Sequence, residues 1–523
     1  MNQLFYGDNL EILQKYIGDE TVDLCYVDPP FNSKRNYNQI YNNVGKDDIA
    51  QSQAFVDTWE WGHSAEFQLE LLRSEPRYTR RLVETIFGLE RILGKGAMLA
   101  YLVSMAIRFA EVWRVLKPTG SFYVHCDPTA SHYLKIILDS IFCDRGGDFR
   151  NEIVWCYKSR PQSKRHFGKK HDSIFFYTKS DKYTFHWDVI ARPLSEETVK
   201  KYRLIDENGR HYRLQGRGIT GSPIRSAKDV DQKWETTNPE LVVRDYLDEK
   251  LGVAQEDWWV IDIINQSARE RLGYATQKPL ALLERIIKAS SNEGDMVLDA
   301  FCGCGTTVDA AHSLNRKWVG VDITYNAVSL ILKRLKDRYG SEIEQQIQLF
   351  GLPKDLKAAT ALAHKKDDRL RKEFEKWAIL TYTDNHAIIN DKKGADRGLD
   401  GIAYIHGGKA VFSVKSGGVT VKDVRDLRGV MDREEAAAGV LLTLEEPTKP
   451  ILQEAATLGC VENVPGLKML RKIPKLQIVT IQEMLDGARM SLPLPEPVVK
   501  SAKRHENKNN SRQIDFEDNE THS

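Results

Sequence analysis

An Asp-Pro-Pro-Phe sequence at residues 28–31 has the composition of a pocket for a planar amine. Pro29 and Pro30 fix the backbone and remove two N–H donors, so carbonyl oxygens and the Asp28 carboxylate remain as acceptors. An exocyclic amine offers two N–H donors, and the Phe31 ring offers a flat face on which a planar base can stack. The alternative is a strand-ending turn with a partly buried phenylalanine, and the tetrapeptide alone does not decide between them.

A second group of residues has the pattern of a nucleotide-binding loop. Gly303 and Gly305 permit a tight turn and a close approach of the backbone to a ligand. Asp322 follows 17 residues after Gly305, where a carboxylate can accept from both hydroxyls of an adenosyl ribose. A dinucleotide site is the competing interpretation, but it normally needs a third glycine, which this loop lacks. The candidate loop residues are Asp299, Phe301, Gly303, Gly305 and Thr306.

A third group is a positive segment without acidic residues, from position 158 to position 171. Its cations are Lys158, Arg160, Lys164, Arg165, Lys169 and Lys170. Such a segment can contact DNA phosphates with a strong dependence on salt. Tyr157 and Phe167 could stack on bases, whereas core packing explains Trp155 equally well. A solvated basic loop is the plain alternative.

Alternating apolar runs must position these groups. Strands are expected at residues 22–27, 121–126, 153–157, 174–177, 296–301 and 318–322, and helices at 99–116, 130–141, 280–289, 306–313 and 327–335. Strands separated by helices predict a doubly wound, parallel α/β sheet with helices on both faces. Open α/β sheets place ligands at the carboxyl ends of their strands, which is where Asp28 and the glycine loop follow.

The remaining segments predict several parts. Regular alternation is lost at about residues 185–265, which we interpret as an inserted module. A charged stretch is expected to form a helical linker to a second, smaller α/β domain, and a tail rich in proline, asparagine and mixed charges is expected to be disordered. The predicted boundaries are 1–345 for the first domain, 346–372 for the linker, 373–490 for the second domain and 491–523 for the tail.

The composition excludes several classes of protein. The 523 residues suffice for two to four domains, and 75 basic against 74 acidic residues exclude a polycation of the histone kind. An apolar content of 41% with 10 Trp excludes global disorder. The 7 Cys include no CxxC pair, which favours reduced thiols over a disulfide framework or a zinc ribbon. We see no signal peptide or membrane span, so we expect a soluble protein without membrane partners.

Taken in order, these motifs resemble the β group of DNA amino-methyltransferases. Residues 28–31 resemble motif IV, and the glycine loop resembles motif I. Lys278 and Pro279, in Thr-Gln-Lys-Pro-Leu, resemble motif X, and Asp8 lies in a segment resembling the one near the adenine end of the cofactor. The catalytic motif precedes the cofactor motifs, as in that group, and the resemblance covers about residues 3–340. Phe31 departs from the more usual tyrosine.

The resemblance implies a Rossmann-like enzyme that transfers the methyl group of S-adenosylmethionine to an amino group of a base flipped out of double-stranded DNA. Asp in first place is commonest for adenine N6, and cytosine N4 stays open. Asp28 and Pro29 would hold the amine within the Pro30 corner, and Phe31 would stack on the base. Asp8, Lys278, Pro279, Asp322 and the glycine loop would hold the cofactor without a metal. The inserted module would read the DNA sequence, in a homodimer or a monomer of the prokaryotic cytosol.

A further constellation lies near the carboxyl terminus. Asp400 and Lys415 flank two strand-like runs joined by Gly407-Gly408, and a hairpin would bring the two side chains close. This arrangement resembles the Mrr-like branch of the PD-(D/E)xK nucleases over about residues 370–485. In that branch Asp and an acidic or amide residue bind Mg²⁺ while Lys assists the attacking water. Glu375 could add another acid on the metal side.

Ser413 stands where the nuclease resemblance requires Glu, Asp or Gln. A hydroxyl is a poor ligand for Mg²⁺ compared with a carboxylate. Three interpretations therefore stay open for this region: Mg²⁺-dependent cleavage in a bifunctional restriction–modification enzyme, a degenerate DNA-binding descendant, and a plain solvent-facing strand. Residues 434–439 followed by 440–444 predict a helix and then a buried strand.

Overall fold

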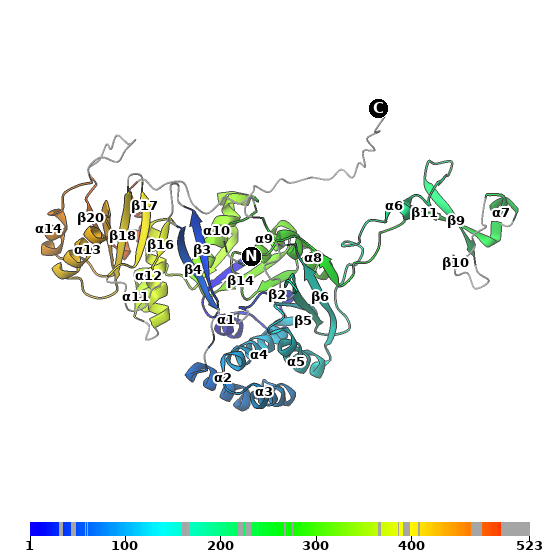
Figure 1. Ribbon diagram of the computed structural model, residues 1–523, viewed down its shortest axis with the longest axis horizontal. Coiled ribbons are helices and arrows are strands. Elements are labelled where there is room, and N and C mark those ends of the chain that lie inside the picture. The colour runs from blue at the N-terminus through cyan, green and yellow to red at the C-terminus, as the bar shows by residue number, and fades with distance from the viewer. Residues whose placement is uncertain are drawn as a thin grey trace, which may run out of the picture.

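The computed structural model (Figure 1) describes most of the chain. The described residues are 1–30, 35–42, 49–57, 59, 61–158, 165, 167–217, 223–224, 232–237, 239–265, 268, 270–272, 274, 276–364, 368–384, 386–390, 398–405, 408–461 and 473–492. None of the helices in this part of the chain combines the length and the apolar character that crossing a bilayer requires.

A nine-stranded sheet forms the centre of the first domain, in the order β12-β6-β7-β5-β2-β13-β14-β1-β15. Neighbouring strands are parallel, except that β7 is antiparallel to both β5 and β6. The strands are β1 (Asn2–Tyr6), β2 (Val22–Val27), β5 (Leu116–Cys126), β6 (Asp148–Cys156), β7 (His171–Thr178), β12 (Trp258–Val260), β13 (Met296–Asp299), β14 (Lys317–Asp322) and β15 (Ile347–Phe350). The predicted α/β sheet is confirmed.

Helices cover both faces of this sheet because its central strands are apolar on both sides. In β2, Leu24 and Tyr26 belong to one core cluster, whereas Cys25 and Val27 belong to the other. The first cluster is completed by α8 (Leu280–Ser290), α9 (Thr306–Ser313) and α10 (Tyr325–Tyr339). The second is completed by α1 (Asn9–Tyr16), α2 (His63–Ser74), α3 (Arg80–Leu93), α4 (Ala97–Val115) and α5 (Ser131–Phe142), which a 3-10 turn (Cys143–Arg145) follows.

An inserted module interrupts the sheet between β7 and β12. It carries its own small antiparallel sheet, and Figure 1 shows it extending away from the nine-stranded sheet. Its elements are α6 (Glu196–Val199), β8 (Leu204–Ile205), β9 (His211–Arg217), β10 (Pro223–Ile224), α7 (Gln232–Thr237), a 3-10 turn (Pro239–Leu241) and β11 (Val242–Tyr246). A separate antiparallel hairpin, β3 (Arg35–Asn42) with β4 (Ile49–Asp57), follows the Asp28 corner.

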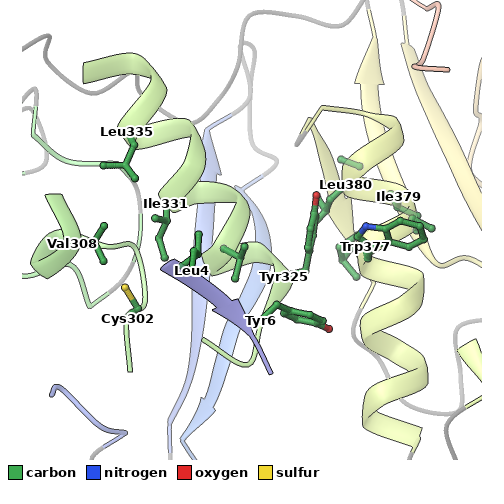
Figure 2. Packing of buried hydrophobic residues seen from close by; sticks show 14 of the residues in the cluster. Leu4, Tyr6, Cys302, Val308, Tyr325, Ile331, Leu335, Trp377, Ile379 and Leu380 are labelled. Carbon is green, nitrogen blue, oxygen red and sulfur yellow. The ribbon is translucent and has the colours of Figure 1, made fainter. Parts of the chain in front are cut away.

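The carboxyl-terminal domain is built on a five-stranded sheet, in the order β16-β17-β18-β19-β20. Its first pairs are antiparallel, and β18, β19 and β20 run parallel. Its strands are β16 (Ala387–Ile389), β17 (Gly401–Ile405), β18 (Gly408–Lys415), β19 (Ala438–Thr443) and β20 (Leu476–Thr480). Its helices are α11 (Leu356–Ala363), α12 (Asp368–Tyr382), α13 (Val421–Arg433), α14 (Lys449–Ala456) and α15 (Ile481–Leu485). Figure 2 shows α12 packed beside α10 and β1 of the first domain.

The structure differs from the sequence-based segmentation at three places. Within the predicted linker, β15 pairs with β1 as an edge strand, because Phe350 stacks on Phe5 at 4.5 Å between ring centroids. The other end of that linker is the start of α12. The range given to the inserted module includes β12, which belongs to the main sheet. Residues 434–437 form a turn after α13 rather than a helix, with Glu435 at φ 49°.

Candidate active site

Two predicted motifs meet at one edge of the nine-stranded sheet. Strands β2 and β13 are neighbours and parallel, with Leu298 of β13 opposite Cys25 of β2. The Asp28 corner begins where β2 ends, and the glycine loop begins where β13 ends. Both motifs therefore lie at the carboxyl edge of adjacent strands, the place where open α/β sheets bind ligands.

The Asp28 carboxylate uses only one of its oxygens in a described contact. Lys278 Nζ is ion-paired with Asp28 Oδ2, and Lys278 itself is buried at 8% exposure. Pro279, also buried, precedes the first residue of α8 and fixes the direction in which this lysine enters the site. Asp28 Oδ1 is buried without a hydrogen-bond partner among the described residues, and we call it the open oxygen. Pro29 is buried, and Phe31 lies outside the described residues.

A buried polar network lies behind this corner, and the sequence analysis missed it. Tyr26 OH lies 2.9 Å from His125 Nδ1, and His125 Nε2 lies 3.1 Å from Asp172 Oδ2. Because a carboxylate only accepts, His125 Nε2 donates to Asp172, and Nδ1 faces the tyrosine hydroxyl. Burial disfavours the charge of Asp172, but hydrogen bonds from His125 and the ammonium of Lys278 outweigh it and lower the pKa of Asp172. Lys278 therefore lies in the field of two carboxylates.

The glycine loop adopts the left-handed conformation that its glycines permit. Gly303 has φ 51° and Gly305 has φ 75°. A Cβ atom at Gly305 would lie 2.7 Å from Ile331 Cγ1, so only glycine allows the loop to pack against α10. Gly303 N donates to Asp322 Oδ2 at 2.8 Å, which joins the loop to the end of the neighbouring strand β14.

Two carboxylates in this half of the site have raised pKa values. Burial raises the pKa of Asp322 to about 6, although Thr324 N and Oγ each donate to Asp322 Oδ1 at 2.9 Å. Burial raises the pKa of Asp299 to about 7, although Phe301 N donates to Asp299 Oδ1 at 3.0 Å. Asp322 is the better exposed of the two and can accept from a ligand, whereas Asp299 is 3% exposed and shapes the loop.

Tyr274 connects the two halves of the site. Its ring would lie 3.4 Å from a Cβ atom at Gly303, so it packs directly against the loop. Its side chain is 6% exposed, and burial, followed by the charges of Asp322 and Asp28, raises the pKa of its hydroxyl well above the usual value. This residue was not predicted from the sequence, although it lies four positions before Lys278, just ahead of the motif X segment.

Arg334 of α10 contacts the glycine loop and was not predicted from the sequence. Arg334 is 2% exposed, and its Nε donates to Asp309 Oδ2 at 2.7 Å. Its Nη1 donates to Thr306 Oγ at 3.0 Å and to Cys304 O at 3.2 Å. Thr306, which the sequence analysis assigned to the cofactor, is therefore part of a buried brace between α9 and α10.

The Asp8 carboxylate is hydrogen-bonded within the protein. Its carboxylate caps α1 by accepting from Leu10 N at 2.9 Å, and Arg108 Nη2 donates to its other oxygen at 2.8 Å. The next residue, Asn9, donates to Ala300 O at 2.7 Å beside the glycine loop. The segment thus lies next to the loop, as the family resemblance implies, and Asp8 helps to hold it there.

The basic loop rises from the same edge of the sheet as Asp28. Val27 lies opposite Val124 of β5, and the end of β5 pairs with the start of β7, where the loop returns. Tyr157 N donates to Lys170 O at 3.0 Å and closes the base of the loop. Lys158, Arg165 and Lys169 are exposed and Lys170 is half-buried, whereas Arg160 and Lys164 lie outside the described residues. The exposed cations can therefore face a ligand at this edge.

The aromatic residues of this region divide into two kinds. Trp155 is 2% exposed and donates from Nε1 to Ile261 O at 2.8 Å, which makes it a core residue. Phe167 is 98% exposed within the basic loop. Phe167 is therefore exposed where a base could meet it, whereas Trp155 belongs to the core.

The acids of the carboxyl-terminal domain have a different environment. Asp400 Oδ2 accepts from Val414 N at 2.8 Å and from Ser413 Oγ at 3.4 Å. Lys372 Nζ lies 2.9 Å from Glu375 Oε2 and 3.9 Å from Asp400 Oδ1. Lys415 is paired with Asp423 at 3.3 Å. Across the described residues, no three His, Cys, Asp or Glu side chains are grouped as metal ligands.

These residues do not fit a Mg²⁺ ion. Among the described residues, the Lys372 ammonium lies between Glu375 and Asp400, and the third position offers the Ser413 hydroxyl, a poorer ligand for Mg²⁺ than a carboxylate. The hairpin does bring Asp400 next to Ser413, but the described contact of Lys415 is with α13.

Comparison with known protein families agrees with both halves of the chain. A family model described as DNA methylase, for N6- and N4-methyltransferases, matches residues 22–333. A model described as restriction endonuclease, of the Mrr type, matches residues 371–472. The first match covers more than half of the 523 residues, so the chain belongs to the N6/N4 DNA methylase family and carries a restriction-endonuclease-like domain after it.

Individual relatives resemble the first domain. The chain is 30% identical over 263 residues to the type II methyltransferase M.EcaI of Enterobacter cloacae, which is 45% of this chain and 57% of that protein. It is 27% identical over 334 residues to the DNA adenine methyltransferase YhdJ of Escherichia coli K12, 64% of this chain and 82% of that protein. The solved PvuII DNA methyltransferase, which is cytosine-N4-specific, matches with TM-score 0.35 at 14% identity, over 63% of this chain and 85% of that one.

Proposed function

We propose that this protein transfers the methyl group of S-adenosylmethionine to the exocyclic amino group of a base in double-stranded DNA. The observation that carries the proposal is the open oxygen of Asp28 at the edge that also holds the glycine loop. A buried acceptor left without a partner costs about 1–3 kcal/mol, so Asp28 Oδ1 is expected to be satisfied by a ligand, an ion or an ordered water, and its place beside the glycine loop favours a ligand.

The Asp28 corner can hold an amine in one orientation. Lys278 occupies Oδ2, so an incoming N–H donates to Oδ1, and the Pro29 carbonyl is the second acceptor we assign. Two acceptors on the amine hydrogens direct its lone pair away from the ring, which makes a weak nucleophile more reactive. An amino group at the Watson–Crick edge reaches such a pocket only after the nucleotide is flipped out of the duplex, and Phe31 is the residue we assign to stack on it.

The neighbouring half of the site fits the cofactor. When bound, S-adenosylmethionine supplies an electrophilic methyl group on a sulfonium centre. The left-handed Gly303 and Gly305 let the loop backbone approach a ligand, and Asp322 can accept from ribose hydroxyls. Tyr274 packs against the loop at Gly303 and is itself buried.

We infer that the target atom is adenine N6. The support from this chain is the Asp in the first position of motif IV. YhdJ, a relative over 64% of the chain, is a DNA adenine methyltransferase. The basic loop would grip phosphates and the inserted module would read the sequence. A homodimer and the domain boundaries remain predictions, which sedimentation analysis and limited proteolysis of the full chain would test.

The test uses tritiated S-adenosylmethionine and duplex DNA of mixed sequence. Wild-type protein should load tritium onto the DNA, and Asp28→Ala should reduce the rate about a thousandfold while calorimetry shows unchanged cofactor binding. Lys117→Met, which removes an ion pair to Asp23 at the opposite end of β2, is the matched control and should retain full transfer. Undiminished transfer by Asp28→Ala would exclude this assignment.

A further inference from the structure

Helix α12 lies within the restriction-endonuclease match, yet one of its acids reaches into the methyltransferase domain. Glu373 is 8% exposed, and its Oε2 accepts from Tyr6 OH at 3.2 Å and from Tyr325 N at 3.2 Å. Its other oxygen is paired with Lys376 Nζ at 3.0 Å. A buried carboxylate with this many partners is held in a single position.

Both methyltransferase partners of Glu373 are direct neighbours of Asp322. Tyr6 lies opposite Asp322 in the pairing of β1 with β14, and the next amide, Gly7 N, donates to Asp322 O at 2.9 Å. Tyr325 is the first residue of α10, and its neighbour Thr324 donates to Asp322 Oδ1. Glu373 is thus connected to the two segments that orient this carboxylate.

The surrounding contact is apolar and closed. Figure 2 shows Tyr6 and Tyr325 pointing from the first domain toward Trp377 and Leu380 of α12. The two tyrosine rings meet edge to face at 6.4 Å between centroids, and Tyr325 OH lies 2.9 Å from Thr381 Oγ. Trp377 and Leu380 are 3% and 1% exposed, so water does not screen the Glu373 contacts.

We propose that Glu373 is a positioning residue for the S-adenosylmethionine site, so that docking of the carboxyl-terminal domain and cofactor binding strengthen each other. The inference rests on the proposed function through the role of Asp322. Thermodynamic linkage makes this effect mutual. If docking of α12 favours the cofactor-bound arrangement of Asp322, then bound cofactor favours docking of α12 by the same free energy. The restriction-endonuclease-like domain would then complete the methyl-donor site, in addition to anything it does with DNA.

The charge of Glu373 adds a second, electrostatic effect. Its carboxylate lies at the amino terminus of α10, where a negative charge is favourable for the helix dipole. The same charge repels the Asp322 carboxylate and adds to the effect of burial in raising the pKa of Asp322. Neutralising Glu373 should therefore extend cofactor binding to lower pH, an effect that a purely mechanical support would not produce.

The test compares Glu373→Ala and Glu373→Gln in the full chain by calorimetry with S-adenosylmethionine between pH 5 and pH 8. Glu373→Ala should weaken binding about tenfold at pH 8, with the methyl-transfer rate at saturating cofactor unchanged within about twofold. Glu373→Gln should lose less cofactor affinity at pH 8 than Glu373→Ala does. As the pH falls, its affinity should begin to drop at a lower pH than that of the wild type. Glu454→Gln, which removes a pairing with Arg425 on the outer helices of the same domain, is the control.

A second variant protects the test against a folding defect. Tyr6→Phe removes one hydrogen bond to Glu373 and keeps the ring, and it should weaken cofactor binding about threefold, without adding to the effect of Glu373→Ala in the double variant. Cofactor should also slow hydrogen exchange in α12 of the wild type. Equal affinity of wild type, Glu373 variants and Tyr6→Phe would overturn this inference alone, whereas a wild type that binds no cofactor would overturn the proposed function.

Discussion

Asp28 in the first domain and Asp400 in the second both lie at strand ends, and both are acids that the sequence marks as catalytic. Asp28 is tied by Lys278 at one oxygen and presents the open oxygen at the edge of the sheet. Asp400 is tied by Val414 N and Ser413 to its own hairpin, and an ammonium faces its other oxygen. Asp28 therefore keeps an oxygen available for a ligand, whereas both oxygens of Asp400 contact groups of its own domain.

The difference shows that residue type identifies a candidate, whereas the remaining hydrogen-bonding capacity identifies a site. At Asp400 one oxygen accepts from Val414 N and Ser413 Oγ and the other faces Lys372, so a metal ion would have to displace these partners. At Asp28 the protein supplies one cation and leaves the geometry for a second donor unfilled among the residues the structure describes.

After Asp28→Ala itself, the largest effect on methyl transfer should come from removing the lysine that orients Asp28. Lys278→Met leaves Asp28 and Asp172 without their shared cation, so the carboxylate is free to turn away from the amine. We expect methyl transfer to fall about a hundredfold. Single-turnover transfer to duplex DNA measures this. Lys333→Met, which removes a half-buried pair with Asp337 within α10, should keep the wild-type rate, and an equal rate in Lys278→Met would contradict the role of the Lys278–Asp28 pair.

The next effect concerns the cofactor half of the site. In the proposed site an ionised Asp322 would accept from ribose hydroxyls, and burial raises its pKa to about 6, so protonation should compete with binding as the pH falls. The dissociation constant for S-adenosylmethionine should be flat above about pH 7 and rise toward tenfold per pH unit below about pH 6.

The matched variant is Asp322→Asn, which cannot ionise. It should bind S-adenosylmethionine about thirtyfold more weakly at pH 8, and its remaining affinity should no longer depend on pH between 5.5 and 7. Isothermal calorimetry at each pH measures both quantities. A titration with the same midpoint in Asp322→Asn would assign the pH dependence to another group.

A smaller effect is expected from the acid of the second domain. Asp400→Ala leaves the buried Val414 N without its acceptor and should destabilise the β17–β18 hairpin by about 1–3 kcal/mol. Methyl transfer should stay within about twofold of wild type. Hydrogen exchange at the hairpin amides measures the loss of stability, and tritium transfer to DNA measures the methylation rate. Unchanged exchange protection would show that Asp400 does not tie the hairpin.

The smallest expected effect is on DNA cleavage. With unmethylated duplex DNA and millimolar Mg²⁺, wild type and Lys415→Ala should both leave the DNA intact on a gel, because the acids here do not fit the ion. Fragments that form with the wild type and not with Lys415→Ala would support a bifunctional restriction–modification enzyme. Asp400 would then be a catalytic acid like Asp28, and the difference drawn between them would be wrong.

The parts predicted from sequence are those with local signals. The strands around Asp28 and the glycine loop are short apolar runs with turn residues, so periodicity locates them. The network from Tyr26 through His125 to Asp172 joins three strands across 146 positions of sequence, and no local pattern connects such residues. Glu373 directly follows the predicted linker, and only packing shows that α12 buries it against the first domain.

The most direct test of the central claim identifies the modified atom. Duplex DNA is incubated with the full chain and S-adenosylmethionine, digested to nucleosides and analysed by mass spectrometry against standards. The open oxygen beside the glycine loop predicts methylation of an exocyclic amino group, and Asp in the first position of motif IV favours N6-methyl-2′-deoxyadenosine in wild-type samples and none with Asp28→Ala. N4-methyl-2′-deoxycytidine would support the amine pocket but assign it to cytosine, whereas 5-methyl-2′-deoxycytidine or an unmodified digest would contradict the account.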